Sequence, residues 1–405
     1  MIKIGILIDR LNVGGVEKIA IEQVRALRNI GEDAVLIVLR RKAVIEGAFS
    51  DILEGVPIEY LDDRLPSWLR GSFNFPIFHF FAFFHLSYPI LLPWTLKKGE
   101  YDYIICHGTY TAFSAIMIRK IKKIPFSCFI WDPIGYILQR VYREKFSKPM
   151  FLFLFAIANH VDRIILKNSD KILVGGDAHN EHLRLLKSDI EIVEIHPSVH
   201  PIVDQIEKKD YVLLVTAWKS GKHPEYIFEL VEKIPEIRVK MVGKWIEEVY
   251  RKEFECEIDS RKLKNNIEII GAVTERELQR YYAEATVLLQ TNDDKGFGMP
   301  ALEAAGNGTT FIIPEGQGVC SLFQNGIDGY FTKEKETETI VQHLHFLLAN
   351  RNESENMGRH ALETVRNSYS WEKHALALQI IIRECLYHPS MHVFQLCTSR
   401  SDRQC

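Results

Sequence analysis

The chain has 405 residues, enough for about two to three domains that each bury a hydrophobic core. Hydrophobic residues make up 47% and charged residues 25% of the sequence, a balance typical of a folded globular protein and not of a disordered one. Lys and Arg number 50 against 53 Asp and Glu, and the formal net charge of -3 excludes a generally basic nucleic-acid binder.

The N-terminus and the cysteines indicate where the protein works. The chain opens with MIKIGILIDR, which predicts a buried first strand and has no features of a secretory signal. The 7 cysteines are an odd number and form no CxxC pair. We therefore expect a reducing, cytoplasmic compartment, and neither a disulfide framework nor a zinc ribbon.

Short apolar runs alternate with helical patterns in the first half of the chain. We predict a helix over residues 16–29, and strands over residues 2–8, 34–39, 103–106, 126–130 and 171–174. This alternation is typical of an α/β domain with a parallel sheet. The first strand leads into Gly14 and Gly15, a turn that opens the helix, where free backbone N–H groups favour an anion.

Two apolar stretches interrupt this pattern. Residues 73–94 are dense in aromatics and long enough to span a bilayer, but prolines and histidines break the stretch. Residues 150–157 are apolar and too short to span, and residues 139–148 between the two are rich in Arg and Lys. Three interpretations stay open: two core-packed helices with a solvated loop, a surface that lies on a membrane, or a transmembrane helix.

The pattern breaks and restarts near residue 200. Residues 196–201 hold two prolines, which disfavour a helix and suit a hinge or linker. Beyond them we predict helices over residues 224–233, 275–285 and 298–305, and strands over residues 211–216, 238–242, 267–270, 286–290 and 311–313. The sequence thus predicts two doubly wound α/β domains in tandem, with a ligand cleft at the carboxyl ends of both sheets.

Residues 266–331 carry the most specific chemistry. Gly296, Phe297 and Gly298 form a flexible loop just before a helix, where exposed N–H groups suit a phosphate or sugar hydroxyls. Glu303 lies about one and a half turns into that helix, and its carboxylate can accept two hydrogen bonds from a vicinal diol such as a ribose. Gly318, after the next strand, belongs to a second set of N–H groups.

This stretch resembles the nucleotide-sugar site of glycosyltransferases with the GT-B fold, specifically glycosyltransferase family 4 (glycosyl transferases group 1). It reads GFGMPALEAAGNGTTFII, then EGQGV and NGIDGYF. The opening GGVEKIAIEQVRAL and the late SYSWEKHALALQIII resemble the family's first helix and its last helix. The resemblance covers about residues 2–385 and implies two Rossmann-like domains that face each other across a deep cleft.

The same resemblance sets the expected domain limits. It implies an N-terminal acceptor-binding domain over residues 1–197 and a C-terminal nucleotide-sugar-binding domain over residues 202–367. Residues 368–385 would form a helix that crosses back to the N-terminal domain. Residues 386–405 are polar and lack periodicity, so we expect a mobile tail there.

The resemblance also implies roles for individual residues. Glu303 would hold the ribose, the N–H of Gly15 would face the phosphates, and Lys222 matches a lysine that contacts the pyrophosphate. The predicted nucleotide-sugar-binding residues are Gly15, Lys222, Lys295, Gly296, Phe297, Gly298, Glu303 and Gly318. The predicted catalytic residues are Lys222, Asp132 and His107.

Two of these residues have plain structural alternatives. Asp132 matches the Asp of a His-Asp pair, with Trp131 in place of the His, but it could also be a turn residue before Pro133. His107 matches a polar position on the family's acceptor side, but it could also be a histidine at a capped strand end.

Two positions depart from the family pattern. Lys295 stands where the family has a Glu that contacts the sugar, although Asp293 or Asp294 could supply a carboxylate by a shift of register. The family's pyrophosphate Arg falls on Thr216 or Ala217. Lys219 could replace that Arg as a point charge without bidentate geometry.

The resemblance implies a retaining glycosyltransferase that moves a hexose-type sugar from a GDP- or UDP-linked donor. No obligatory metal is expected, because lysine and helix termini would stabilise the departing diphosphate. The aromatic and basic segments suggest a lipid-linked saccharide or glycolipid as acceptor, and peripheral contact with the cytoplasmic face of the membrane; we expect no nucleic-acid partner. A non-catalytic nucleotide-sugar-binding subunit and a GT-B-fold epimerase are the alternatives.

Overall fold

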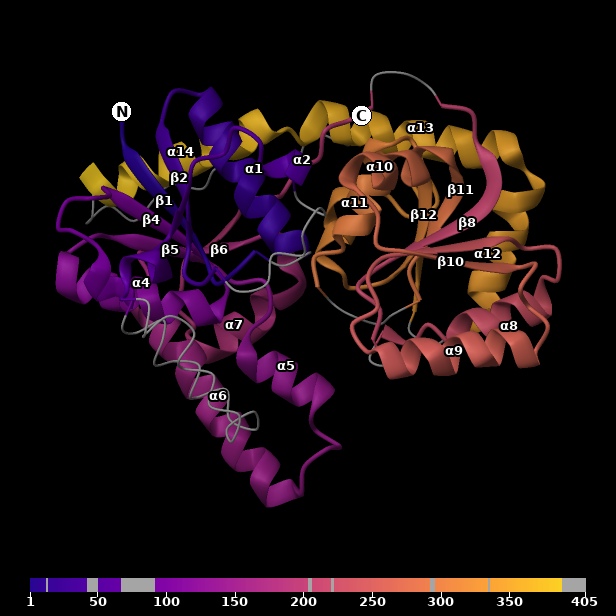
Figure 1. The fold of residues 1–405 in the computed structure, drawn as a ribbon, viewed down its shortest axis with the longest axis horizontal. Coiled ribbons are helices and arrows are strands. Elements are labelled where there is room, and N and C mark those ends of the chain that lie inside the picture. The colour runs from indigo at the N-terminus through magenta and orange to yellow at the C-terminus, as the bar shows by residue number, and fades with distance from the viewer. Residues whose placement is uncertain are drawn as a thin grey trace.

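The computed structural model describes residues 1–11, 14–41, 50–66, 92–202, 206–219, 222–291, 296–333 and 336–387. Within these ranges the chain forms two separate parallel β-sheets, each flanked by helices, which lie side by side in Figure 1. The predicted α/β class with two doubly wound domains is confirmed. Lys295, residues 73–91 and residues 388–405 lie outside the described residues.

The first sheet has the strand order β3-β2-β1-β4-β5-β6-β7, and every pairing in it is parallel. Its central strands are the apolar runs that the sequence predicts, and all residues of β4 are buried. A strand buried on both faces is what helices on both sides of a parallel sheet require. The strands are β1 (Lys3–Ile8), β2 (Asp33–Val38), β3 (Ile58–Tyr60), β4 (Tyr103–His107), β5 (Phe126–Phe129), β6 (Ile172–Val174) and β7 (Ile192–Glu194).

Helices connect these strands. The predicted helix after the first strand is confirmed as α1, which begins at Gly15 and buries one face that includes Ile19, Leu27 and Gln23. The α-helices of this half are α1 (Gly15–Asn29), α2 (Ser50–Leu53), α4 (Thr109–Lys122), α5 (Ile134–Val141), α6 (Lys148–Asn168) and α7 (Asn180–Leu186), with a 3-10 turn, η5, at Asp177–His179.

The second sheet has the order β10-β9-β8-β11-β12-β13 and is also parallel throughout. Its strands are β8 (Lys209–Val215), β9 (Val239–Val242), β10 (Ile267–Gly271), β11 (Ala285–Leu289), β12 (Thr310–Pro314) and β13 (Tyr330–Thr332). Its α-helices are α8 (Tyr226–Lys233), α9 (Glu248–Ser260), α10 (Glu275–Glu284), α11 (Met299–Gly306), α12 (Thr337–Ala349) and α13 (Arg351–Ser368), with a 3-10 turn, η7, at Gly318–Leu322.

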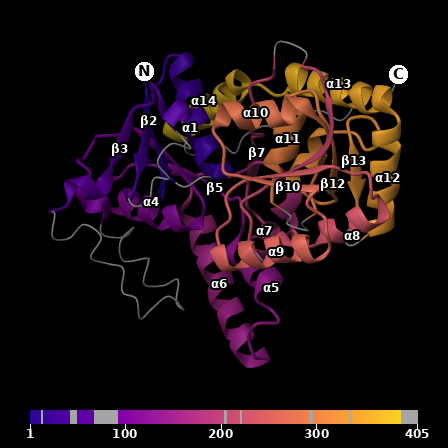
Figure 2. The ribbon, with the colours of Figure 1, turned by 45° about the vertical axis from the view of Figure 1, so that its right-hand side comes forward.

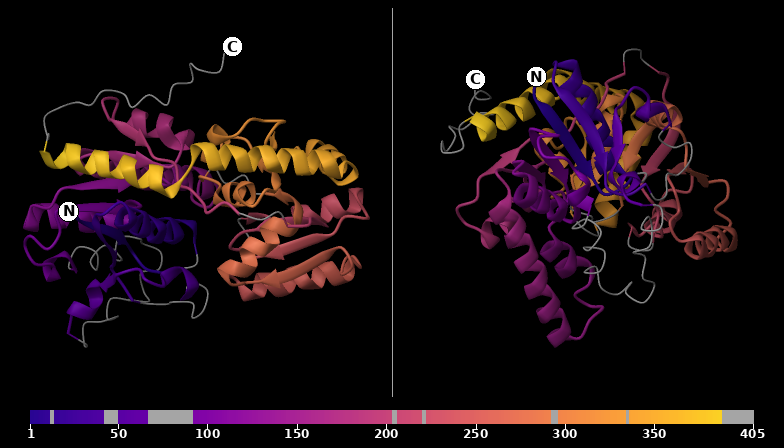
Figure 3. Two further views of the ribbon diagram at one scale, coloured as in Figure 1. Left: turned by 90° about the horizontal axis from the view of Figure 1, so that it is seen from above. Right: turned by 60° about the vertical axis from the view of Figure 1, so that its left-hand side comes forward.

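The chain passes between the two halves twice. The first passage runs from the end of β7 at Glu194 to the start of β8 at Lys209. The second separates α13 from α14 (Trp371–Tyr387), two helices that run end to end across both domains when seen from above (Figure 3). The buried side chains of α14, among them Trp371, Leu378 and Ile382, share the hydrophobic core of β1 and α1.

Helices α5 and α6 form an antiparallel pair that projects away from both domains (Figures 1 and 2). At the base of the pair, the Asp162 carboxylate of α6 accepts hydrogen bonds from the N–H groups of Ile134 at 3.2 Å and Gly135 at 2.8 Å. At the far end, Leu152 is 54% and Phe153 63% exposed. Core packing of residues 150–157 is therefore wrong, since this part of α6 has no core around it.

Candidate functional site

The two domains meet where α1 and α11 begin. A β-carbon on Gly15 would lie 3.2 Å from Cγ of Met299, so the N-terminal turns of the two helices face each other across the cleft. Both turns leave backbone N–H groups without a partner in their own helix, and both helix dipoles place positive charge there. The cleft at this point is suited to an anion.

The predicted glycine loop is present at the start of α11. Gly298 has a φ of 91°, in the left-handed region, and a β-carbon on it would lie 2.5 Å from Oε1 of Gln317. Glycine is therefore required both for the backbone conformation and for the space. Phe297 extends across the cleft and meets Trp131 edge-on, with 6.5 Å between ring centroids. The loop thus contacts the first domain across the cleft.

The backbone amide of Gly318 is not available in this conformation. Its N–H donates to the carbonyl of Gly296 at 3.1 Å, and the next amide, of Val319, donates to Phe297 at 2.7 Å. The expectation that this glycine presents an open N–H to the ligand is therefore not met here. Gly318 instead ties the β12–η7 loop to the glycine loop.

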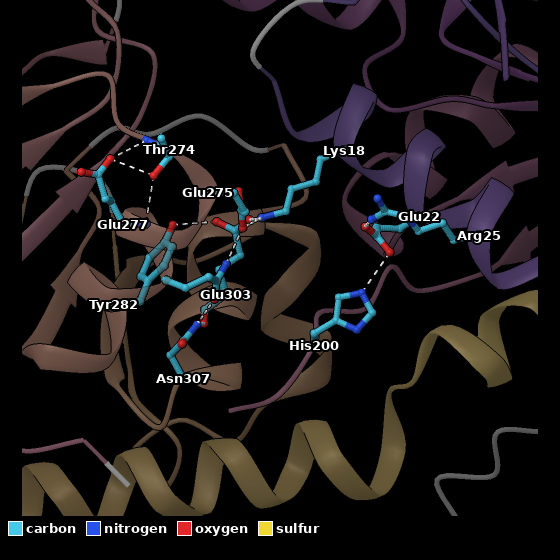
Figure 4. Close-up of polar contacts among 11 residues, drawn as sticks. Lys18, Glu22, Arg25, His200, Thr274, Glu275, Glu277, Tyr282, Glu303 and Asn307 are labelled. Carbon is cyan, nitrogen blue, oxygen red and sulfur yellow. Dashed lines mark hydrogen bonds and ion pairs between the residues drawn. The ribbon is translucent and has the colours of Figure 1, made fainter. Parts of the chain in front are cut away.

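Glu303 is the centre of a polar cluster that spans both domains (Figure 4). Its Oε1 accepts from Nζ of Lys18, on α1, at 2.5 Å, and its Oε2 accepts from the hydroxyl of Tyr282, on α10, at 2.7 Å. Only 8% of the Glu303 side chain is exposed. The carboxylate proposed for the ribose therefore lies behind a lysine of the opposite domain.

Lys18 also reaches a second carboxylate. Its Nζ donates to Oε1 of Glu275, on the first turn of α10, at 2.6 Å, and Gln279 donates to the same oxygen at 2.5 Å. Burial by itself would lower the pKa of Lys18, but the charges of Glu303 and Glu275 outweigh it and raise that pKa well above its usual value. The ammonium is therefore permanently charged and balances one of two carboxylates.

His107 lies in a chain of buried hydrogen bonds behind the cleft. Nε1–H of Trp131 donates to Nδ1 of His107 at 3.2 Å, so the ring proton of His107 is on Nε2, which donates to Gln23 at 2.7 Å. The Gln23 amide then donates to Nε2 of His374 at 3.0 Å, and Nδ1–H of His374 donates to the carbonyl of His196 at 2.7 Å. In each histidine ring one nitrogen donates a hydrogen bond and the other accepts one, so both histidines are neutral.

The surroundings keep them neutral. Burial, and then the neighbouring His374, lower the pKa of His107 to about 3, and burial lowers the pKa of His374 to about 4. With both ring nitrogens engaged, His107 orients Trp131, and through it the aromatic contact with Phe297.

Asp132 stands at the cleft side of this group. Its side chain is 44% exposed, and its Oδ1 lies 3.3 Å from Nε2 of His179, which is 5% exposed. The contact lacks hydrogen-bond geometry, so neither ring nitrogen of His179 has a hydrogen-bond partner among the described residues. Asp132 is thus an accessible carboxylate that lies next to the buried imidazole of His179.

Lys222 lies after β8, and its N–H donates to the carbonyl of Lys219 at 2.9 Å. Because β8, β11 and β12 are neighbours in the sheet, Lys222, the glycine loop and Gly318 all follow adjacent carboxyl ends. A cavity of about 510 Å³ opens at this edge, lined by His223, Gln290, Thr291, Pro314 and Thr332 among others. Neither Glu303 nor the glycine loop lines this cavity.

Comparison with known proteins agrees with this arrangement. Residues 198–364 match the family model of glycosyl transferases group 1. The second domain is a glycosyltransferase domain. Trehalose synthase of Pyrococcus horikoshii is 24% identical over 89% of this chain and 85% of its own length, and trehalose synthase of Thermococcus litoralis is 22% identical over 68% of each.

The solved structures share the architecture. Alr3699/HepE of Anabaena in complex with UDP and glucose superimposes with a TM-score of 0.70, at 15% identity, over 94% of this chain and 99% of that one. Sucrose-phosphate synthase of Thermosynechococcus elongatus gives a TM-score of 0.71 at 16% identity, over 95% and 99%. The fold is the GT-B fold of glycosyltransferases, as the sequence resemblance implied.

Several residues of the site have no counterpart in the sequence prediction. Lys18, Glu275 and Tyr282 were not predicted as site residues, although Lys18 lies within the segment GGVEKIAIEQVRAL. Lys18 meets its partners only because the two domains fold against each other. His179 could have been noticed, because it follows a predicted strand in the same way as Asp132 does.

Proposed function

We propose that the protein is a retaining glycosyltransferase of family 4 that transfers a hexose-type sugar from a nucleotide-diphosphate sugar. The observation that carries the proposal is the arrangement around α11: the glycine loop, the buried Glu303 and the facing N-terminal turn at Gly15 enclose one end of the cleft. Relatives named for trehalose and sucrose-phosphate synthesis, and a neighbour solved with UDP and glucose, support this class of substrate.

The residues would divide the work as follows. Glu303 accepts hydrogen bonds from the ribose, while the N–H of Gly15 and the ammonium of Lys222 stabilise the diphosphate as it leaves. The loop Gly296–Gly298 and Lys295 position the sugar. The bond from the anomeric carbon to the phosphate oxygen breaks, the acceptor oxygen bonds to the same face, and the acceptor's proton goes to the departing phosphate. No metal is needed for this charge balance.

The acceptor side would be formed by the first domain. Asp132 is exposed enough to accept a hydrogen bond from an acceptor hydroxyl. His107 would act as a positioning residue, since its lowered pKa and its two engaged nitrogens leave no proton to exchange near neutral pH.

The acceptor is proposed to be a lipid-linked saccharide or glycolipid at the cytoplasmic membrane face. α5 starts directly after Asp132 and Pro133 and leads away from the cleft to the exposed apolar part of α6. Residues 139–148 at the turn hold four basic side chains and one acidic one. Apolar side chains next to a basic cluster suit the interface of an anionic membrane.

The geometry favours lying on the membrane over crossing it. Among the described residues, α6 is the one helix long and apolar enough to cross a bilayer, and 28% of its most apolar stretch is buried. However, Ala158, Ile165 and Leu166 are buried in the first domain. Only about ten residues project, or about 15 Å, against about 30 Å of hydrocarbon.

Sedimentation with vesicles tests the membrane contact. The protein should sediment with vesicles of phosphatidylcholine mixed with phosphatidylglycerol, and less with phosphatidylcholine alone. A Leu152→Asp/Phe153→Asp variant should stay in the supernatant. Val249→Asp, at an even more exposed apolar position of α9 in the second domain, should behave as the wild type. If the Leu152→Asp/Phe153→Asp variant sediments as the wild type does, α6 does not contact the membrane.

Thermal unfolding with UDP, GDP and ADP tests the nucleotide-sugar site. A nucleotide at about 100 times its Kd should stabilise the wild type by roughly 2.7 kcal/mol and leave Glu303→Ala unchanged. Lys295 and the absent pyrophosphate Arg favour a non-catalytic nucleotide-sugar-binding subunit as the second candidate. Nucleotide binding without sugar transfer to any lipid or glycan acceptor would select it.

A further inference from the structure

The contacts of Glu303 raise a question of access. A ribose diol must bond to this carboxylate, yet Oε1 already accepts from Lys18 and Oε2 from Tyr282, which leaves one further lone pair on each oxygen. The Glu303 side chain is only 8% exposed, and Lys18 comes from the opposite domain. A ribose that bonds to Oε1 would therefore meet the Lys18 ammonium there.

A second carboxylate, that of Glu275, is an alternative ion-pair partner for Lys18. Glu275 already lies 2.6 Å from the Lys18 ammonium, and the N-terminal turn of α10 and the Gln279 amide stabilise its charge. If Lys18 leaves Glu303, it keeps one ion pair and does not become a buried unpaired cation, which would be costly. Lys18 bridges the two carboxylates, and Glu275 can hold its ammonium when the contact with Glu303 is lost.

We propose that Lys18 competes with the nucleotide ribose for Glu303, and that Glu275 is the carboxylate that retains Lys18 when the ribose binds. This inference rests on the proposed function, in which Glu303 binds the ribose. Lys18 and Glu275 are positioning residues that act through Glu303.

The competition predicts opposite effects for two substitutions in the same cluster. Lys18→Met removes the competitor, so nucleotide should bind at least about five-fold more tightly, as the binding-competent fraction rises. Glu275→Gln removes the alternative partner, so Lys18 stays on Glu303 and binding should weaken by at least about three-fold. A merely structural role of the cluster predicts that both substitutions change the Kd in the same direction.

Two further variants keep the test interpretable. Lys18→Met/Glu275→Gln removes one charge of each sign, so the net charge of the cluster is unchanged, and it should bind tightly like the single lysine variant. Glu22→Gln breaks a different contact of α1, the 2.9 Å pair with His200 of the linker, and should leave the Kd unchanged.

The measurement is calorimetric titration at pH 8 with whichever of UDP, GDP and ADP the wild type binds, and with its nucleoside. The nucleoside lacks phosphates, so equal fold-changes for nucleoside and nucleotide place the effect at the ribose. An unchanged or weaker Kd for both lysine variants would overturn the inference while the proposed function stands. No binding of any of the three nucleotides by the wild type, in a folded protein, would overturn the proposed function instead.

Discussion

Gly176 of the first domain packs directly against Gly318 of the second. A β-carbon on Gly176 would lie 2.8 Å from both Cα and the carbonyl oxygen of Gly318, a separation that real β-carbons essentially never show. Gly176 has a φ of -173°, an extended backbone that any residue can adopt, so the requirement is for space alone. The absence of two side chains is what allows η5 and η7 to touch across the cleft.

Gly176→Ala should therefore force the domains apart. The contact is with backbone, which cannot rotate away as a side chain could, and overpacking of this kind costs about 1–3 kcal/mol. We expect a larger radius of gyration in X-ray scattering and a lower Tm. Gly31→Ala is the control, because nothing lies within 4 Å of its β-carbon and its strain is local. Scattering identical to that of the wild type would contradict this prediction.

Gln23→Leu should break the chain of hydrogen bonds between His107 and His374. The substitution leaves Nε2–H of His107 and Nε2 of His374 buried without partners, at about 1–3 kcal/mol each. The free energy of unfolding, measured in urea, should fall by the sum of these two losses. Gln379→Leu removes a glutamine that bonds Glu32 at a partly exposed position, and its loss should be smaller. Equal losses for the two variants would argue against a special role of the buried chain.

The two neutral histidines should make the protein acid-sensitive. Their folded pKa values, about 3 and about 4, lie below the value of about 6.5 in an unfolded chain, so the unfolded state binds more protons as the pH falls. Stability is thus fully present above about pH 6.5 and is lost toward pH 4. Between pH 7 and pH 5 each histidine should account for about 2 kcal/mol.

The matching variant is His374→Gln. Its free energy of unfolding should be lower at pH 7, because a buried partner is lost, but it should fall less steeply with acid by about 2 kcal/mol over the same range. Unfolding in urea at both pH values measures this difference. A variant with the wild-type pH dependence would show that the pKa of His374 is the same in the folded and the unfolded state.

Asp162→Ala should loosen the projecting helix pair. Asp162 accepts from the first N–H groups of α5, so its loss removes the cap, at about 0.5–2 kcal/mol. Limited proteolysis within residues 139–148 should become faster. Asp162→Asn keeps an accepting oxygen and should restore most of the protection. Cleavage of the alanine variant at the wild-type rate would mean that α5 is held by packing alone.

Much of the fold could be predicted because its signals are local. The core strands are continuous apolar runs, as in β1 and β4, and Gly15 and Gly298 mark helix starts by their type. The edge strands β3, β7 and β13 were missed, since each has three residues and none is fully buried. Such strands form through pairing with a neighbour and leave no pattern in their own sequence.

The sequence predicted which residue types form the site, but not which side chains contact one another there. The glycine loop and Glu303 follow from a motif, but the partner of Glu303 lies 285 residues away on a helix whose pattern shows only its amphipathic face. For the apolar part of α6 the sequence left three interpretations open, and the structure excludes core packing because this part projects from the first domain. Apolar composition alone does not distinguish a helix packed in a core from a helix with an exposed apolar surface.

The return of the chain through α14 has a consequence for synthesis on the ribosome. Trp371, Ala375, Leu378 and Ile382 complete the core that begins with Ile4 and the face of α1, so the first domain lacks part of its interior until α14 is made. During synthesis the first sheet lacks the cover of α14 until the whole second domain has emerged from the ribosome. A nascent chain stopped before α14 is therefore an aggregation-prone intermediate, and neither domain boundary is a safe point for truncation.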